Sequence, residues 1–464
     1  MDFTLAALAS VLGMLFLMLM GMRIIFALGF TALVVAYFAY GPLSLEKIGW
    51  TTFNTLFNIN WVPLPLFVLI ACLIAETKMG EHIYEAARNW LSRVPGGLIV
   101  TSIFGEAAMA SAIGTSSACI LAVGKVAEPE FRKYGYDQGL AMGGLCCGGV
   151  LGPLIPPSAG FIIYGVLAEA SIGRLFMAGI MPGVLLALML AATAILVCWR
   201  KRGAGPAVGG VSWRERFTSL KWVWPVVVVM LAILGSIYFG IASPTEAAGV
   251  GCAVVLLLGV TVFHLRWQGL RRALIETAIM NGMILFMMVG AWLFSYVIGT
   301  SGVVNTITSW VRDSGLSPWW VIIAINVILL ILGCFIDAIT IMLLTVPLFV
   351  PIINALGFSP IWFGVLYVVN MQIGLITPPM GLELFMMRTA FNIPVDKLLR
   401  GVTPFIIVLF IFLALLIAFP EISVSQEQKP ENNPQGRDVV QNQMHVCQVH
   451  RPVSSREMTE LISL

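Results

Sequence analysis

The stretch Gly152-Pro153-Leu154-Ile155-Pro156-Pro157 breaks an apolar segment at a double proline, and Gly374-Leu375-Ile376-Thr377-Pro378-Pro379 repeats the break 222 positions later. The correspondence continues downstream, because Gly179 and Gly401 follow the two breaks at the same offset. Proline enforces such a break, since it removes a backbone donor and clashes with the preceding helical turn. A duplicated and interrupted membrane helix is typical of a transporter's binding site.

The composition indicates a polytopic membrane protein. Of the 464 residues, 59% are hydrophobic and 11% are charged, and the mean hydropathy is +0.96, far from an average globular domain. The N-terminus is interpreted as a first span and not as a signal peptide, because Asp2 stands where a basic region is expected. The net charge of +3 is small, and no basic stripe interleaved with aromatic residues indicates nucleic-acid binding. Seven of the eight cysteines lie in apolar segments without a CxxC pair, which favours small core fillers over disulfides or a metal site.

Segments of spanning length set the predicted topology, since a membrane helix needs about 20 mostly apolar residues. Segments 138–170 and 361–391 contain the double prolines, and each is predicted to be one crossing made of two half-helices. Segments 97–127 and 318–356 carry polar or small residues at their centres, and we predict re-entrant hairpins there. The remaining predicted spans are 3–21, 24–40, 58–76, 175–199, 222–240, 246–265, 275–299 and 402–420.

The distribution of Lys and Arg predicts the side of each loop, because short cytoplasmic loops are enriched in both. The basic loop over residues 200–221 marks the cytoplasm, so the first hairpin opens from inside and the second from the opposite side. Five predicted crossings separate the hairpins, and an odd number inverts the second copy. The fold class is therefore an all-α polytopic membrane protein with inverted repeats, each containing a re-entrant hairpin and a broken transmembrane helix.

These segments divide the chain into five parts. The polar, proline-containing C-terminal part lacks lasting periodicity and is predicted to be disordered. Segment 79–92 is predicted to be an amphipathic helix in the membrane interface, with a soluble connecting helix as the alternative. The parts are scaffold helices with this amphipathic helix over 1–93, the first transport module over 94–200, central scaffold helices over 201–300, the second module with the last span over 301–420, and the tail over 421–464.

The breaks predict ion sites. A broken helix leaves unpaired C=O groups on one half and unpaired N–H groups on the other, and carbonyl oxygens suit a small cation. Thr115 precedes Pro156 by 41 residues and Asp337 precedes Pro378 by 41, so each break is paired with a polar hairpin tip. We predict one sodium site per repeat: Ser116, Ser117, Gly152, Ile155 and Pro157 in the first, and Gly333, Asp337, Gly374, Thr377 and Met380 in the second.

Several candidates have a structural alternative. Asp337 could cap a half-helix of its hairpin, although a carboxylate inside a membrane is functional by default. Glu106 also lies within a predicted hairpin and has no evident partner. Ser243 to Glu246 favours a helix-capping box over a binding role. Substrate contacts are assigned to Thr115, Ser158, Glu383 and Arg388, with an interfacial position as the alternative for the last.

The sequence contains no ATP-binding loop of the form G-x-x-x-x-G-K-[ST]. It also contains no convincing pairing of a nucleophile with a base, so we predict a protein that is not an enzyme and has no organic cofactor. An ion gradient is then the expected energy source, with Na⁺ as the coupling ion.

Over residues 1–420 the chain resembles the large membrane subunit of a TRAP transporter (tripartite ATP-independent periplasmic transporter). The motifs that carry the resemblance are Gly152 to Ser158, Ser243 to Ala248, Gly374 to Gly381, and Gly401 to Pro404 before a final apolar span. Two features depart from the family: Glu383 stands where members often have asparagine or another small residue, and the 421–464 tail extends beyond the point near the last span where the family usually ends.

The resemblance implies a sodium-coupled importer of small organic acids in the bacterial inner membrane that works by an elevator movement, as in the ion transporter superfamily. It also implies two partners, a periplasmic substrate-binding protein and a small four-helix membrane subunit, which we expect as separate chains. C4-dicarboxylates, sialic acid and related carboxylates stay open as substrates. The alternatives are a stand-alone ion-coupled carrier of the same architecture and, from other classes, a channel or an intramembrane enzyme.

Overall fold

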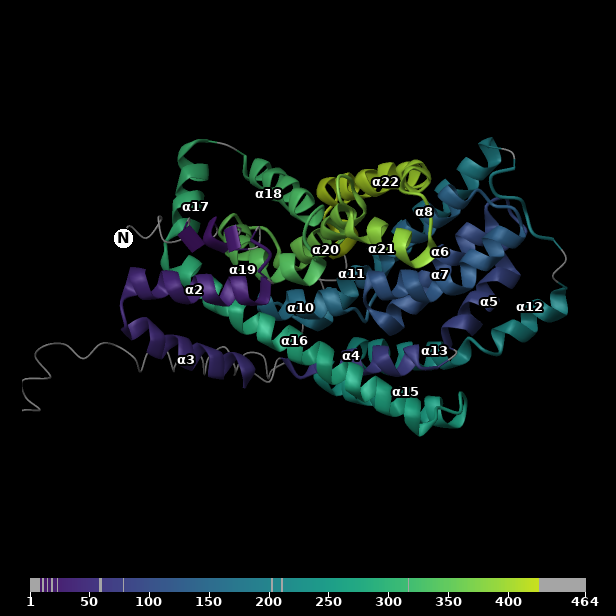
Figure 1. The fold of residues 1–464 in the computed structure, drawn as a ribbon, viewed down its shortest axis with the longest axis horizontal. Coiled ribbons are helices and arrows are strands. Elements are labelled where there is room, and N and C mark those ends of the chain that lie inside the picture. The colour runs from purple at the N-terminus through teal and green to yellow at the C-terminus, as the bar shows by residue number, and fades with distance from the viewer. Residues whose placement is uncertain are drawn as a thin grey trace, which may run out of the picture. The chain divides into compact units, whose positions relative to one another are not determined.

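The computed structural model describes residues 9–424, apart from residues 11, 15, 18, 19, 23, 58–60, 78, 202, 210, 211 and 316. Every regular element in this part of the chain is a helix (Figure 1). By length and composition, six of these described helices can cross a membrane, and the number is up to eight if each of two bent helix pairs is one span. The predicted span 3–21 lies largely outside the described residues.

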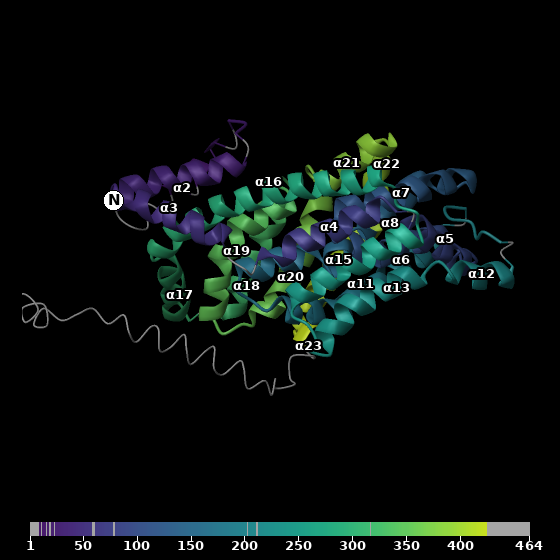
Figure 2. The same cartoon turned by 90° about the horizontal axis from the view of Figure 1, so that it is seen from below.

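A long helix, α16 (Trp267–Thr300), organises the N-terminal helices. α2 (Ile24–Tyr40), α3 (Leu43–Leu56) and α4 (Pro63–Ala75) all pack against it, as Figures 1 and 2 show from two directions. The residues of α2 and α4 are almost entirely apolar, so the contacts are made by hydrophobic side chains. These helices lie within segments 1–93 and 201–300, whose role as a scaffold stays a prediction.

α15 (Pro244–Thr261) packs on α4 and begins with the predicted capping box. The Ser243 hydroxyl accepts a hydrogen bond from the Glu246 backbone N–H, and the Glu246 carboxylate accepts one from the Ser243 N–H at 2.7 Å. The prediction of a structural role for Ser243 and Glu246 is confirmed. In addition, an exposed salt bridge of 2.6 Å between Arg272 Nη2 and Glu76 Oε2 joins the beginning of α16 to the end of α4.

The first predicted hairpin consists of α6 (Gly97–Ile113) and α7 (Ser116–Lys133), which are joined by two residues and pack against each other. The first predicted broken helix follows as α8 (Gln138–Gly148), α9 (Leu151–Leu154) and α10 (Ala159–Leu167). The part before the double proline and the part after it differ in direction by 46°. α11 (Ile172–Arg200) then runs as one helix of 29 residues.

The second hairpin and break have the same order of elements. α18 (Pro318–Gly333) and α19 (Ala338–Ala355) pack together, α20 (Pro360–Ile376) ends at the second break, and α21 (Leu382–Phe391) begins after it. α22 (Val395–Ala418) is the last long helix. The Pro156-Pro157 and Pro378-Pro379 bonds are both cis.

The two modules share one hydrophobic core. The Tyr164 hydroxyl of α10 donates a 2.7 Å hydrogen bond to the Pro360 carbonyl, and its ring lies 5.8 Å from that of Tyr367 on α20. α22 packs along α8, where a Cβ atom added to Gly401 would overlap the backbone carbonyl of Gly139. Only glycine allows this close approach.

The structure corrects several predicted boundaries. α16 begins at Trp267 instead of 275, and α22 begins at Val395 instead of 402, because both continue through polar turns that hydropathy does not mark. The predicted span 222–240 is confirmed: α13 (Trp224–Met230), a π-helical turn (Leu231–Gly235) and α14 (Ser236–Tyr238) follow one another without a gap and form part of one helix of spanning length. The residues predicted as tail begin with a short helix, α23 (Glu421–Val424), and the rest of the tail lies outside the described residues.

Amphipathic helices account for the other differences. α5 (Met79–Leu91) confirms the helix predicted over 79–92, and it packs on α6 and on α12 (Trp213–Leu220). α3, α12 and α17 (Val303–Asp313) were not predicted, since their polar faces keep them below the hydropathy of a span.

Replacing Gly401 with alanine tests the close contact between α8 and α22. A Cβ atom at this position overlaps backbone, so we expect destabilisation of about 1–3 kcal/mol, seen as a lower melting temperature in detergent. Gly249→Ala on α15 is the matched control, because nothing lies within 4 Å of the added atom. Equal melting temperatures for Gly401→Ala and the native chain would contradict the packing described here.

Candidate functional site

A cavity of about 220 Å³ lies where the two hairpin connections meet the two broken helices. The first hairpin contributes Gly114 to Ser117, and the second contributes Asp337 to Ile339. Segments far apart in the sequence therefore form one site. The broken helices and α19 add Pro153, Ala159, Gly160, Ile163, Met342, Met371, Gln372, Leu375, Leu382 and Glu383.

The first hairpin connection packs directly on the first break. Gly114 has a left-handed φ of 69° that terminates α6, and its carbonyl accepts a 3.3 Å hydrogen bond from the backbone N–H of Ala159. A Cβ atom on Gly152 would lie 3.1 Å from the carbonyl group of Thr115. The 41-residue register predicted this pairing of tip and break.

The second hairpin makes an even closer backbone contact with the second break. A Cβ atom on Gly333 would lie 2.8 Å from the Cα atom of Gly374. Thr377 ends α20, and its hydroxyl donates a 2.6 Å hydrogen bond to the Ile373 carbonyl. Its proton is therefore committed to the helix, while oxygen lone pairs remain for another ligand.

The position of Asp337 is compatible with both roles considered from the sequence, a helix cap and a ligand-binding group. Its Oδ1 atom accepts a 3.1 Å hydrogen bond from the Thr340 N–H, so it is the N-cap of α19. Its side chain is nevertheless exposed and lines the cavity. Only one carboxylate oxygen is used by the cap, and the other is available to a ligand.

The structure brings together some of the predicted site residues and separates others. Thr115, Ser116, Ser117, Asp337 and Glu383 all line the cavity. The Ser116 hydroxyl is buried without a hydrogen-bond partner. Ser158 lies outside the lining and caps α10, where its hydroxyl accepts a 3.1 Å hydrogen bond from the Phe161 N–H. Arg388 is exposed on α21. The other predicted residues lie at or beside the breaks without lining the cavity: Gly152, Ile155, Pro157, Gly333, Gly374, Thr377 and Met380.

Sequence reasoning missed Gln372. This side chain is 2% exposed, lines the cavity, and its Oε1 atom has no hydrogen-bond partner. The signal was an amide in the apolar run that precedes the second double proline. Asn370, two residues earlier, instead donates a 3.0 Å hydrogen bond to the Asn326 carbonyl of α18 and so has a structural role.

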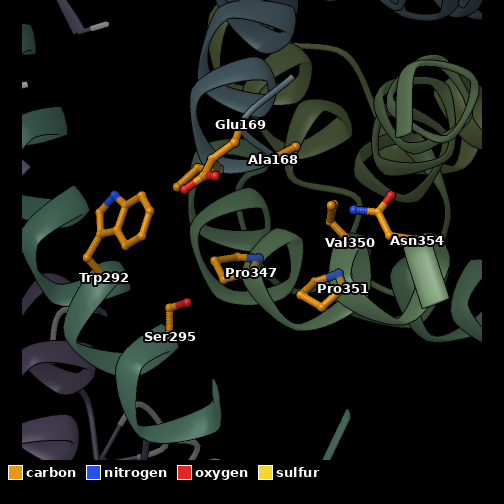
Figure 3. A pocket seen from close by; sticks show the side chains of 9 residues that line it. Ala168, Glu169, Trp292, Ser295, Pro347, Val350, Pro351 and Asn354 are labelled. Carbon is orange, nitrogen blue, oxygen red and sulfur yellow. The ribbon is translucent and has the colours of Figure 1, made fainter. Parts of the chain in front are cut away.

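A second cavity of about 250 Å³ lies between the end of α10, α19 and α16. Figure 3 shows its lining, with Glu169 at the end of α10 facing Trp292 and Ser295 of α16, and Asn354 on the far side. This cavity lies away from both breaks, and none of the predicted site residues lines it.

Comparison with known proteins adds the family. The family model for the DctM component of the tripartite ATP-independent periplasmic transporters matches residues 11–422. The chain belongs to this family. It is therefore a multi-pass permease of the bacterial inner membrane and not an enzyme, as predicted. The family is ion-coupled. A transporter of this family implies two partners, a small permease and a periplasmic binding protein.

Several relatives are similar over most of their length. The C4-dicarboxylate large permease of Pseudomonas aeruginosa is 33% identical over 387 residues, which cover 83% of this chain and 90% of that protein. The sialic acid large permease of Vibrio cholerae is 31% identical and is covered to 97%, with 89% of this chain. The ectoine large permease of Halomonas elongata is 29% identical, with coverage of 89% of this chain and 96% of that protein.

Two solved structures share the fold at low sequence identity. The YdaH transporter of Alcanivorax borkumensis matches with a TM-score of 0.58 and 16% identity, over 82% of this chain and 89% of that one. MtrF of Neisseria gonorrhoeae matches with a TM-score of 0.57 and 13% identity, over 83% and 85%. Both likenesses concern the fold alone.

Two substitutions at Asp337 separate its capping role from a role in ligand binding. Asparagine caps a helix as well as aspartate does, whereas alanine costs about 1 kcal/mol. We expect Asp337→Asn to keep the melting temperature of the permease in detergent but to weaken the dependence of uptake on sodium. If Asp337→Asn transports with unchanged sodium dependence and only Asp337→Ala is impaired, Asp337 acts as a cap and not at the ion site.

Proposed function

We propose that this permease is the translocating subunit of a sodium-coupled importer that takes a small organic acid from a periplasmic binding protein. The observation that carries the proposal is the cavity itself, which is formed by two hairpin connections and two broken helices in matching register. Half-helix ends at such a site offer carbonyl groups to a cation and N–H groups to an anion. The same site can thus hold a coupling ion and a carboxylate.

The sodium sites follow the two breaks. The first is formed by Ser116 and Ser117 with the backbone of Gly152, Ile155 and Pro157, and the unpartnered Ser116 hydroxyl supports it. The second is formed by Asp337 and Thr377 with the backbone near Gly333, Gly374 and Met380, and the free lone pairs of Thr377 support it. Two sodium ions moving inward at 100 mV supply roughly 4–5 kcal/mol.

The substrate site lies between the two ion sites. Thr115 and Glu383 line the cavity and remain candidates, whereas Ser158 and Arg388 stand outside its lining. The named substrates of the relatives, C4-dicarboxylates, sialic acid and ectoine, are small molecules with a carboxylate. A cavity of about 220 Å³ suits the smaller of these substrates.

The movement follows from the division into modules. The modules of residues 94–200 and 301–420 share the Tyr164 and Tyr367 contacts, so they move as one body in this proposal. The helices of residues 1–93 and 201–300 stay fixed as the scaffold, and the small membrane subunit enlarges it. Inverted repeats with hairpins that open from opposite sides allow the site to be reached from each side in turn.

The test is uptake into proteoliposomes that contain this permease and its small subunit, with the cognate binding protein outside. An inward sodium gradient should drive accumulation of the substrate, and dissipating the gradient should abolish it. Undiminished uptake without sodium would contradict sodium coupling. Uptake that needs sodium but not the binding protein would instead identify the stand-alone carrier considered above.

A further inference from the structure

Two buried carboxyl groups have no hydrogen-bond or salt-bridge partner among the described residues. Glu106 on α6 is 0% exposed and Glu383 on α21 is 2% exposed. All four carboxyl oxygens lack a hydrogen-bond partner, and neither residue forms a salt bridge within the described part of the chain. Neither group has a role in the sodium sites proposed above.

The two groups occupy a defined place between the first hairpin and the second break. Glu106 Oε2 points at the backbone of α8, where a Cβ atom on Gly148 would overlap it. Glu383 lies in the first turn of α21 and lines the cavity. α8 packs against both α6 and α21, so the fold brings these two residues, 277 positions apart, close enough for their charges to interact.

The described lining of the cavity provides no positively charged side chain. Three buried thiols lie near the two carboxyl groups, Cys119 on α7 with Cys146 and Cys147 on α8. The other acidic group in the cavity lining is the carboxylate of Asp337. No Lys, Arg or His is found among the described residues of the lining, and no described group of His, Cys, Asp and Glu has the arrangement of a metal site.

Two ionised carboxylates cannot stay in such a place. A charge in a membrane interior is expensive without a partner, and a second negative charge nearby adds repulsion that low-dielectric surroundings screen poorly. The pair must therefore be neutralised by a bound proton or another cation. A proton suits this pair, because no basic side chain is described in the cavity lining and the sodium sites proposed above are formed by other residues.

We propose that Glu106 and Glu383 form a proton-binding pair, and that the proton on Glu383 is exchanged in each transport cycle. Glu383 is the point of exchange because it reaches the cavity, while the fully buried Glu106 keeps its proton. One carboxylate oxygen of Glu383 takes a proton from water on the periplasmic side and releases it to water in the cytoplasm. This extends the proposed function, on which its transport step rests, from sodium coupling to combined sodium and proton coupling.

The charge of the substrate gives the exchange a purpose. An organic anion that enters the cavity meets Asp337 and Glu383, both acidic. A proton on Glu383 removes one of these repulsive charges, so protonation and substrate binding favour each other. By linkage, bound substrate must raise the affinity of the site for the proton by the same factor.

The first experiment needs no transport. Infrared spectra of the purified permease with its small subunit, in detergent at neutral pH, should contain the carbonyl band of a protonated carboxylic acid. The band should weaken in Glu383→Gln and vanish in Glu106→Gln/Glu383→Gln. Glu85→Gln, which removes an exposed carboxyl group of α5, should leave the band unchanged. A band of equal size in the native chain and the double variant would overturn the proton pair, whatever the transport function is.

The second experiment measures coupling in the complete system in proteoliposomes. With a fixed sodium gradient and a clamped potential, an acidic exterior should accelerate native uptake several-fold, and an internal pH dye should report acidification that depends on substrate. Glu383→Gln should abolish the acidification per substrate molecule taken up and the pH dependence of whatever sodium-driven uptake remains, and Glu106→Gln should keep the acidification. Native uptake without acidification, or acidification that persists in Glu383→Gln, would overturn the exchange at Glu383. If the native protein shows no sodium-driven uptake, the proposed function itself is contradicted.

Discussion

The structure depends on covering two interrupted backbones inside an apolar protein. An unsatisfied backbone group at membrane depth costs several kcal/mol, so each break survives only where another segment covers it. The Gly114 carbonyl accepts a hydrogen bond from Ala159 just after the first break, and Gly333 lies against the Gly374 backbone just before the second. Each hairpin connection thus packs over its own break, and the cavity lies between the two hairpin connections.

Close backbone contacts also explain why small residues recur in both halves. Gly179 and Gly401 share an offset from the two breaks, yet their neighbours differ. A Cβ atom on Gly179 would lie 2.7 Å from the Leu154 carbonyl at the first break, whereas one on Gly401 would overlap Gly139 at the beginning of α8. The same need for close approach is therefore met at different partners, so equal spacing in the two repeats does not give equal helix contacts.

Much of this fold could be predicted from the sequence because membrane segments show their hydrophobicity directly, and because proline marks a break wherever it stands. The helices α3 and α17 could not, since a half-polar face looks like a loop to a hydropathy pattern. The site was predictable only in part. Register paired each tip with its break, and it led to Thr115 and Asp337. The nearness of Glu106 to Glu383 depends on how α6, α8 and α21 pack, and neither spacing nor composition contains that information.

The charges of the cavity connect the coupling ions to recognition of the substrate. Its described lining contains Asp337 and Glu383 and no basic side chain, so a carboxylate substrate finds no fixed positive partner. Helix N-termini supply only about half a charge each. On the proposed function, sodium ions at the two breaks and a proton on Glu383 must then provide the compensating charge. The ions are in this view part of the binding site as well as the energy source, and an empty site without them would repel the anion. This mutual dependence would couple the ion and substrate fluxes, because the binding of either one alone to the moving modules would be energetically unfavourable.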